Sequence, residues 1–173
     1  LDHRLLEAQR LGFADRQRYS ADPAFVPVPT EGLLSPAYTQ ARAALIAEQA
    51  AGTVPAGEVF PSLSLATDQQ VLEHGTSHFT IVDARGHWLA MTSSIEDAFG
   101  SRLMINGLLM NNQLTDFSFV PELDGLPVAN RVAPGKRPRS AMSPTFVLTA
   151  KGKPLISVGS PGGSRIIGFN TGV

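Results

Sequence analysis

Cysteine is absent from this chain of 173 residues, which excludes disulfide bonds and thiolate metal sites without deciding the cellular compartment. No apolar run reaches the length of a membrane-spanning helix, about 18 residues or more, so no span is expected in this chain. Charged residues make up only 17% of the sequence, and the net charge is −1. With a pI near 6.5, nothing in the composition favours nucleic acid or an anionic membrane as a partner.

A metal site is also not indicated, because the four histidines lack the spacing of metal ligands. They are His3, His74, His78 and His87. No cofactor is expected. What is present is an ordinary globular composition with 43% hydrophobic residues, enough for the core of one domain with a small appendage.

Two helices are expected in the first third of the chain. Leu1–Gly12 has apolar residues at helical spacing and Gly12 as a plausible stop, while the residues at 13–19 either extend or cap this helix. Ser35-Pro36 begins the second helix, because serine is a favoured N-cap and proline a favoured first residue. Gly52 stands where a glycine commonly follows a helix end.

A long loop at 53–73 separates this helical part from a β-rich part. It is interpreted either as a linker or as the segment that delivers the Gly75–Thr76 bond to a cleavage site. The segment 123–139, rich in proline, glycine and basic residues, is expected to be an irregular surface excursion. Strand candidates followed by a helix after Gly163 predict an α+β domain. The strand candidates are Ser77–Val82, His87–Ser93, Arg102–Met110, Ala141–Thr149 and Pro154–Gly159.

The Gly75-Thr76 dipeptide lies directly before the first strand candidate. If the bond is cut, Thr76 becomes a chain start that carries both a nucleophilic hydroxyl and a free amine as general base. Glycine at 75 permits the unusual backbone geometry that attack on its carbonyl needs. From the residues alone, an ordinary buried strand threonine is an equally good interpretation.

Five blocks in order resemble the start of the small subunit of the gamma-glutamyltransferases, which are N-terminal-nucleophile hydrolases. The blocks are TSHFTIVDARGHWLAMTSS at 76–94, FGS at 99–101, MNNQLTDFS at 110–118, KRPRSAMSPT at 136–145 and GSPGGSRII at 159–167. Three upstream blocks are similar to the end of that family's large subunit. They are FADR at 13–16, DPAFVPVP at 22–29 and GLLSPAY at 32–38.

The resemblance implies a four-layer αββα sandwich, of which this chain is a fragment. Residues 1–75 would be the C-terminal end of the large subunit, with helices and a processing loop. Residues 76–173 would be the first part of the small, catalytic subunit. The expected partners are a small gamma-glutamyl substrate and the rest of the large subunit. The implied location is periplasmic or secreted, with a cytoplasmic one left open and no signal peptide visible.

The same resemblance assigns roles around Thr76, the nucleophile. Ser94 stands where the family typically has a threonine that contacts the nucleophile; a solvent-facing strand serine is the alternative. Gly162 and Gly163 supply backbone amides for an oxyanion site, although Gly-Gly before a helix is also common in tight turns.

Substrate contacts are implied at Gln113 and Asp116 for the α-amino group, against the alternative of a loop that satisfies its own backbone. Ser140 matches a serine that binds the α-carboxylate, but the next family serine is Ala141 here. Glu96 replaces an asparagine that contacts the α-amino group; a solvated turn formed with Asp97 is the alternative. No arginine here inherits the family's carboxylate-binding role, and Arg137, Arg139 and Arg165 are expected to be structural or surface groups.

The function expected from these residues is gamma-glutamyl transfer from glutathione or related amides to water, amino acids or peptides through a Thr76 ester. An acylase of another amide, of the cephalosporin or poly-gamma-glutamate type, is the alternative that Glu96 and Ala141 keep open. The third possibility is that the protein is an uncleaved, inactive homologue or fragment. The isolated 173-residue piece is expected to have little activity.

Overall fold

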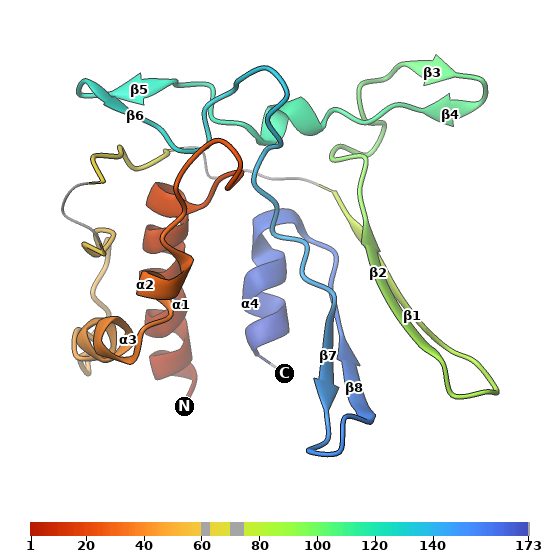
Figure 1. Ribbon diagram of the computed structural model, residues 1–173, viewed down its shortest axis with the longest axis horizontal. Helices are drawn as coiled ribbons and strands as arrows, with labels where there is room; N and C mark the ends of the chain where they lie inside the picture. The colour runs from red at the N-terminus through yellow and green to blue at the C-terminus, as the bar shows by residue number, and fades with distance from the viewer. Residues whose placement is uncertain (60–62, 70–74, 173) are drawn as a thin grey trace. The chain divides into compact units, whose positions relative to one another are not determined.

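The computed structural model describes residues 1–59, 63–69 and 75–172 (Figure 1). It divides into two compact units that interleave in sequence. The first is Leu1–Gln70 with Phe117–Arg139, and the second is Val71–Asp116 with Ser140–Val173. The subunit boundary expected at Gly75 concerns the cutting of the chain and stays a prediction.

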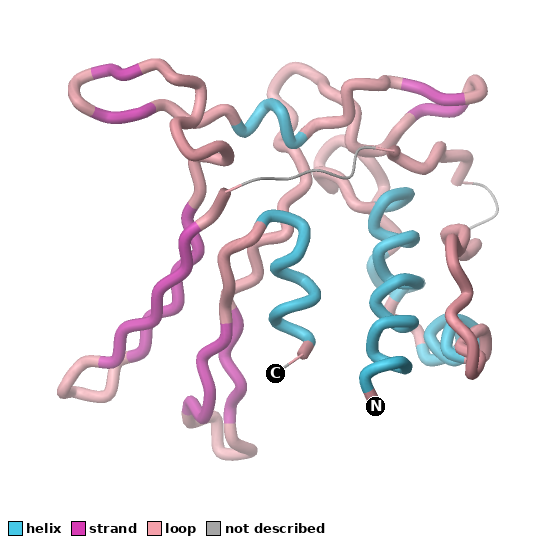
Figure 2. The backbone as a smooth tube through the Cα atoms, turned by 180° about the vertical axis from the view of Figure 1, so that it is seen from behind, coloured by secondary structure: helices cyan, strands magenta, loops and turns pink. Residues whose placement is uncertain are grey.

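The longest regular elements of the first unit are helices, drawn in cyan in Figure 2. They are α1 (Asp2–Tyr19), α2 (Thr30–Leu33) and α3 (Pro36–Ala43). Ser35 caps α3 as expected, since its Oγ accepts a hydrogen bond from the Tyr38 amide at 3.3 Å. The expected end of the second helix is wrong, whereas the first helix follows the alternative in which residues 13–19 extend it. Helix α1 continues through Gly12, because a helical glycine costs only about 1 kcal/mol and the residues beyond it are packed. Helix α3 ends at Ala43, well before Gly52.

The core of the first unit forms around Tyr19, which is fully buried with Leu65 and Ala129. The Tyr19 hydroxyl donates to the Gly57 carbonyl at 2.7 Å, and the Gly57 amide donates to Asp15 Oδ1 at 2.8 Å. The described parts of the expected loop, 53–59 and 63–69, therefore pack against α1 rather than forming a free linker. The remainder of that loop and His74 lie outside the described residues.

The segment expected to be a surface excursion is partly buried instead. It contains the short hairpin of β5 (Glu122–Leu123) and β6 (Leu126–Pro127), and it then contributes Val128, Ala129 and Asn130, all at 2% exposure or less. Composition alone misleads here, because proline and glycine mark irregular backbone and not exposure.

Two ion pairs attach this segment to the rest of the unit. Arg139 Nη1 lies 3.1 Å from Asp68 Oδ2, and both side chains are 2% exposed or less. Arg137 Nε lies 3.2 Å from Asp22 Oδ2. The side-chain and backbone hydrogen bonds from Arg137 hold the pKa of the Asp22 carboxyl well below its usual range. The expectation that Arg137 and Arg139 are structural groups agrees with these contacts.

Antiparallel hairpins make up most of the second unit. The longest pairs β1 (Ser77–Val82) with β2 (Trp88–Ser93), as the sequence predicts, and a second pairs β7 (Thr145–Leu148) with β8 (Pro154–Val158). The expected strand at 102–110 is a short hairpin, β3 (Met104–Ile105) with β4 (Leu108–Leu109), which turns at Asn106-Gly107. Two 3₁₀ turns and a final helix complete the unit. They are η1 (Gln113–Asp116), η2 (Gly163–Arg165) and α4 (Ile166–Thr171).

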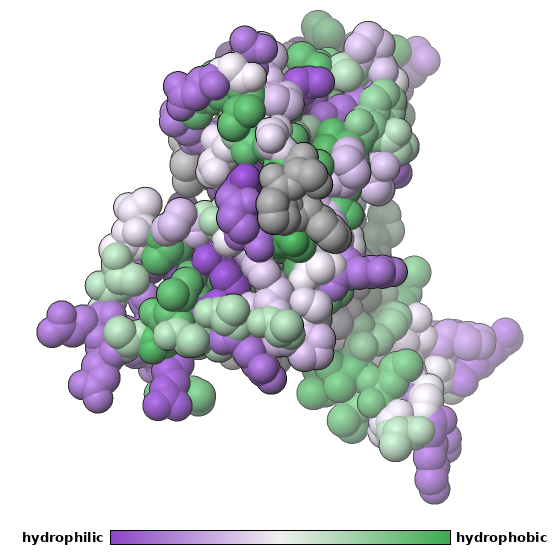
Figure 3. Space-filling model, turned by 60° about the vertical axis from the view of Figure 1, so that its left-hand side comes forward, coloured by the Kyte–Doolittle hydropathy of each residue, from purple (hydrophilic) through white to green (hydrophobic). Residues whose placement is uncertain are grey.

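The two longer hairpins contact each other within this unit. The Trp88 and Phe146 rings meet edge to face at 6.2 Å between centroids, and Thr80 Oγ1 lies 3.0 Å from Ser157 Oγ. The first hairpin also carries an apolar face on which Phe79 pairs with Met91 and Ile81 with Leu89. All four side chains are more than 40% exposed, and Figure 3 shows hydrophobic side chains at the surface.

The described residues thus form an α+β chain with four two-stranded antiparallel sheets. Among them, no helix is both long and apolar enough to cross a membrane.

The buried Arg139–Asp68 pair yields a stability prediction. Replacing Arg139 with Met leaves the Asp68 carboxylate buried opposite an apolar side chain, so Arg139→Met should lower the free energy of unfolding by about 3–5 kcal/mol. Arg18→Met is the control, because Arg18 pairs with Glu58, which is 61% exposed, and such pairs contribute at most about 1 kcal/mol. Urea denaturation of the full-length protein measures both, and equal effects would contradict the importance of the buried pair.

Candidate active site

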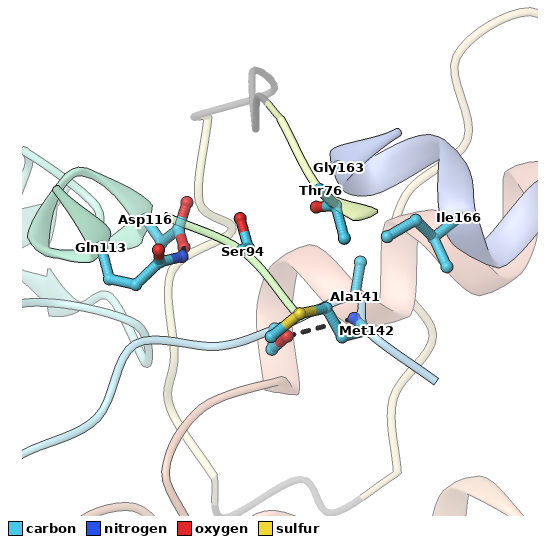
Figure 4. A pocket seen from close by; sticks show the side chains of 9 residues that line it. Thr76, Ser94, Gln113, Asp116, Ala141, Met142, Gly163 and Ile166 are labelled. Atoms are coloured by element: carbon cyan, nitrogen blue, oxygen red, sulfur yellow. Dashed lines mark hydrogen bonds between the residues drawn. The ribbon is translucent and has the colours of Figure 1, made fainter. Parts of the chain in front are cut away.

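A narrow pocket in the second unit collects most of the residues singled out by the sequence (Figure 4). It is lined by Thr76, Ser94, Gln113, Asp116, Ser140, Ala141, Met142, Gly163 and Ile166. Polar side chains and one glycine share this pocket with three apolar side chains. Segments that are distant in sequence therefore meet around the threonine.

Thr76 lies directly before β1, and its hydroxyl is beside the carbonyl of the preceding residue. Thr76 Oγ1 donates a hydrogen bond to the Gly75 carbonyl oxygen. Gly75 has a φ of +30°, and a Cβ placed on it would overlap the carbonyl oxygen of Glu96. Glycine at 75 is therefore required by this close backbone approach, which holds the Gly75–Thr76 bond at the edge of the pocket.

Ser94 contacts the same carbonyl from the end of β2. Antiparallel pairing of Ser77 with Ser93 brings Ser94 opposite Gly75 and Thr76. The Ser94 hydroxyl donates to the Gly75 carbonyl oxygen at 2.7 Å, and its oxygen accepts from the Glu96 amide at 2.9 Å. The amide polarises the hydroxyl, which strengthens its bond to the carbonyl. Ser94 thus lines the pocket, and its expected contact with the nucleophile stays a prediction.

Glu96 supports this corner through its backbone and does not line the pocket. The residue is only 5% exposed and has a φ of +73°, which is uncommon for a residue with a side chain. Its carboxylate accepts a hydrogen bond from Asn112 Nδ2, and Asn112 Oδ1 accepts from the Asp97 amide at 3.0 Å. The alternative of a solvated turn is therefore wrong for Glu96, and its expected contact with substrate stays a prediction.

Gln113 and Asp116 form the polar end of the pocket. Both belong to η1, which brings residues three apart onto one side of a 3₁₀ turn. Gln113 Nε2 donates to Asp116 Oδ2 at 2.8 Å, and Asp116 is 9% exposed. A carboxylate held in this way can accept hydrogen bonds from a cation that enters the pocket.

The opposite wall is apolar, and sequence reasoning missed it. Ala141 is 7% exposed and Ile166 is 1% exposed, while Met142 is more open. Ser140 Oγ accepts from the Met142 amide at 3.1 Å, the bond drawn as a dashed line in Figure 4. The available signal was the apolar residues inside the RSAMSP and GGSRII blocks, at Ala141, Met142 and Ile166.

Gly162 and Gly163 bring backbone amides to this region. Gly163 lines the pocket at the start of η2, while Gly162 precedes it with a φ of +125°. Among the described residues, neither amide has a hydrogen-bond acceptor in the chain. Such a pair can donate to an oxygen that becomes negative during a reaction.

The structure thus places six predicted site residues on one pocket, while Gly75, which precedes Thr76, and two further predicted residues do not line it. The six are Thr76, Ser94, Gln113, Asp116, Ser140 and Gly163, and the two are Glu96 and Gly162. Within residues 1–59, 63–69 and 75–172, no group of three or more histidines and carboxylates is placed to hold a metal ion. The arrangement suits a hydroxyl nucleophile that acts on a carbonyl group.

Comparison with known proteins gives the family. The model of the gamma-glutamyltranspeptidase family matches residues 2–173. The chain is similar to the glutathione hydrolase proenzyme of Bacillus subtilis, with 40% identity over 173 residues, which is 94% of this chain and 28% of that protein. It is also 35% identical to the acylase ACY 1 proenzyme of a Pseudomonas species over 166 residues, covering 95% of this chain and 27% of that protein.

Among solved structures, the chain resembles a gamma-glutamyltranspeptidase from Pseudomonas nitroreducens complexed with L-DON. The identity is 39% and the TM-score is 0.45, with 53% of this chain and 50% of that chain covered. The chain spans less than a third of the length of the curated relatives it matches. On the family match over nearly all its residues, the chain belongs to the gamma-glutamyltranspeptidase family.

Proposed function

We propose that this chain is the processing and nucleophile region of a gamma-glutamyl hydrolase and transferase. The full-length protein would move the gamma-glutamyl group of glutathione or a related amide to water, an amino acid or a peptide. The observation that carries this proposal is the pair of hydroxyls, from Thr76 and Ser94, on the carbonyl oxygen of Gly75. Family membership and the pocket around Thr76 support it.

The first reaction is the cutting of the chain itself. The Thr76 hydroxyl adds to the Gly75 carbonyl carbon, and the Ser94 hydroxyl donates to the oxygen that becomes negative. The bond between the Gly75 carbon and the Thr76 nitrogen then breaks, an ester to Thr76 Oγ1 forms, and the hydroxyl proton ends on the released amine. Water opens the ester, leaving Gly75 with a carboxylate and Thr76 with a free hydroxyl and amine.

The second reaction uses the new chain start on a substrate amide. The Thr76 amine takes the hydroxyl proton, directly or through water, as Oγ1 attacks the substrate carbonyl. The amides of Gly162 and Gly163 donate to the oxyanion, and one such donor lowers the barrier by roughly 3–4 kcal/mol in known cases. The substrate amine leaves with a proton, and water or an acceptor amine then opens the Thr76 ester.

Recognition of glutamate is assigned to the polar end of the pocket. The Asp116 carboxylate, held by Gln113, would accept from the α-ammonium group, and Ser140 would donate to the α-carboxylate. Glu96 would add to the negative potential near the ammonium if its bond to Asn112 opens. No side-chain donor from position 141 is available, so the α-carboxylate is held less firmly here than in relatives with a second serine.

An acylase of a related amide is the second candidate, and the apolar wall favours it. Ala141, Met142 and Ile166 would accept the methylene chain of an acyl group that lacks the α-ammonium group. The similarity to an acylase proenzyme agrees with this alternative. An uncleaved, inactive protein is the third candidate, and it requires that Thr76 never becomes a chain start.

The rest of the enzyme is proposed to complete the fold and the site. The exposed apolar face of the β1–β2 hairpin requires a covering layer, which suits the four-layer αββα sandwich that the family resemblance implies. The remainder of the large subunit would supply the carboxylate-binding arginine. The periplasmic or secreted location belongs to the same proposal. Since the site needs these parts, the isolated 173-residue piece should show little activity, and robust turnover by it would contradict this account.

The nucleophile assignment predicts the mass of the full-length protein. Wild type should give two chains separated between Gly75 and Thr76, and Thr76→Ala should stay a single chain, because alanine has no hydroxyl for the attack. Ser77→Ala, next along the chain and exposed, should be cut like wild type. Intact mass spectrometry measures all three, and cutting of Thr76→Ala at this bond would refute the assignment.

The Ser94 contact predicts the rate of cutting. Ser94→Ala removes a donor to the Gly75 carbonyl oxygen, so cleavage should slow by about 10²–10³-fold, the effect of losing one oxyanion donor. Ser94→Thr should retain most of the rate, because the hydroxyl is kept, and Ser93→Ala is the neighbouring control. Appearance of the smaller chain on a denaturing gel over time gives the rates; equal rates for Ser94→Ala and Ser93→Ala would count against the role.

The polar end of the pocket predicts substrate choice. The full-length enzyme should turn over a gamma-glutamyl anilide at least about tenfold faster than the glutaryl anilide, because only the former has an ammonium for Asp116. Asp116→Asn should reduce this preference mainly by slowing the gamma-glutamyl anilide. Release of the aniline measures both reactions. Faster turnover of the glutaryl anilide by wild type would instead favour the acylase.

A further inference from the structure

His78 lies outside the pocket, yet it connects the strand of the nucleophile to the loop of the oxyanion amides. It is the second residue of β1, two positions after Thr76, and it pairs with Thr92 across the hairpin. Residues two apart in a strand share a face, so Thr76, His78 and Thr80 line the same side of this strand. The imidazole is half-buried.

Hydrogen bonds hold both nitrogens of the imidazole. Nδ1 lies 2.8 Å from Thr92 Oγ1, and Nε2 lies 3.4 Å from Thr80 Oγ1. Thr80 Oγ1 in turn lies 3.0 Å from Ser157 Oγ on β8. The ring orientation is thus determined from both sides, and the network crosses from the first long hairpin to the second.

The ring edge between the two nitrogens points at Gly159. A Cβ built on Gly159 would overlap the imidazole, with Cε1 nearest and both nitrogens close behind. Gly159 directly follows β8 (Pro154–Val158) and opens the loop that leads to Gly162 and Gly163. A glycine is therefore needed at this position to let the loop approach the ring, although its own φ does not require one.

We propose that His78 is a positioning residue that fixes the distance between the Thr76 nucleophile and the Gly162–Gly163 amides. This inference rests on the proposed function, because the distance matters only if Thr76 is the nucleophile and the two amides hold the oxyanion. The imidazole acts as a spacer of fixed orientation between β1 and the start of the loop. It lines no part of the pocket, so it is not assigned a contact with substrate.

The chemistry explains why this distance matters. Addition of Oγ1 to a carbonyl requires the carbon beside the hydroxyl and the oxygen beside the amides at the same time. A shift of about 1 Å in such an arrangement can reduce the rate about a hundredfold. A spacer locked by two hydrogen bonds and a tight backbone contact limits that shift.

The first test replaces the histidine in the full-length enzyme. His78→Phe keeps a ring of similar size but removes both hydrogen bonds, so kcat for a gamma-glutamyl anilide should fall about tenfold to a hundredfold. KM should stay within about twofold, because no ground-state contact with substrate is lost. The shape of the pH profile of kcat should be retained. An unchanged kcat would overturn the proposal, and so would loss of a limb of that profile, which would make His78 a proton-transfer group.

The second test concerns the contact between His78 and Gly159. It decides the question even if the His78→Phe protein folds poorly or is cut poorly at Gly75–Thr76. Gly159→Ala should reduce kcat at least about tenfold, because the new methyl group displaces the loop from the ring. Adding His78→Ala should restore part of the loss by making room, so the double variant should exceed Gly159→Ala alone. Gly12→Ala, where a Cβ meets nothing within 4 Å, is the control for an added methyl group.

The outcomes separate this inference from the proposed function. If the double variant is no better than Gly159→Ala, the ring is not what excludes a side chain at 159, and the proposal is wrong. If wild type is neither cut at Gly75–Thr76 nor active on any amide, the proposed function itself fails. A cut and active wild type with unaffected His78 variants overturns the positioning role alone.

Discussion

The hydrogen bond from the Ser94 hydroxyl to the Gly75 carbonyl oxygen is the contact on which the arrangement of the site depends. It requires the β1–β2 hairpin, because the pairing of these strands brings residue 94 beside residue 75. It also requires a glycine at 75, since the backbone of Glu96 leaves no room for a side chain there. The same bond therefore depends on two local features, the pairing of β1 with β2 and the glycine at 75.

The surroundings of Thr76 divide into groups for chemistry and groups for recognition. The hydroxyl of Ser94 and the amides of Gly162 and Gly163 suit any carbonyl substrate. In the proposed function, recognition is assigned to Asp116 at one end of the pocket and to the apolar wall at the other. In the same proposal, this chain supplies the nucleophile and the donors to the carbonyl oxygen. Ala141 departs from the serine that the family resemblance implies, so the reaction class rests on more residues of this chain than the identity of the acyl group does.

Structural features that depend on short-range interactions were predicted correctly from local sequence patterns. The bounds of β1 and the serine cap of α3 were found because strand alternation and capping are short-range. The C′ role of Gly52 and the exposure of the segment around Arg139 were wrong, because tertiary packing decides them. Glu96 shows the same limit, since only the fold reveals that it is buried against Asn112.

If Thr76 becomes a chain start, the N-terminal sequence of the smaller chain of the mature protein will show it. Edman degradation should give Thr-Ser-His-Phe, the residues at 76–79, as the first residues of that chain. A smaller chain that begins at any other residue, or a mature and active enzyme that remains a single chain, would contradict the account.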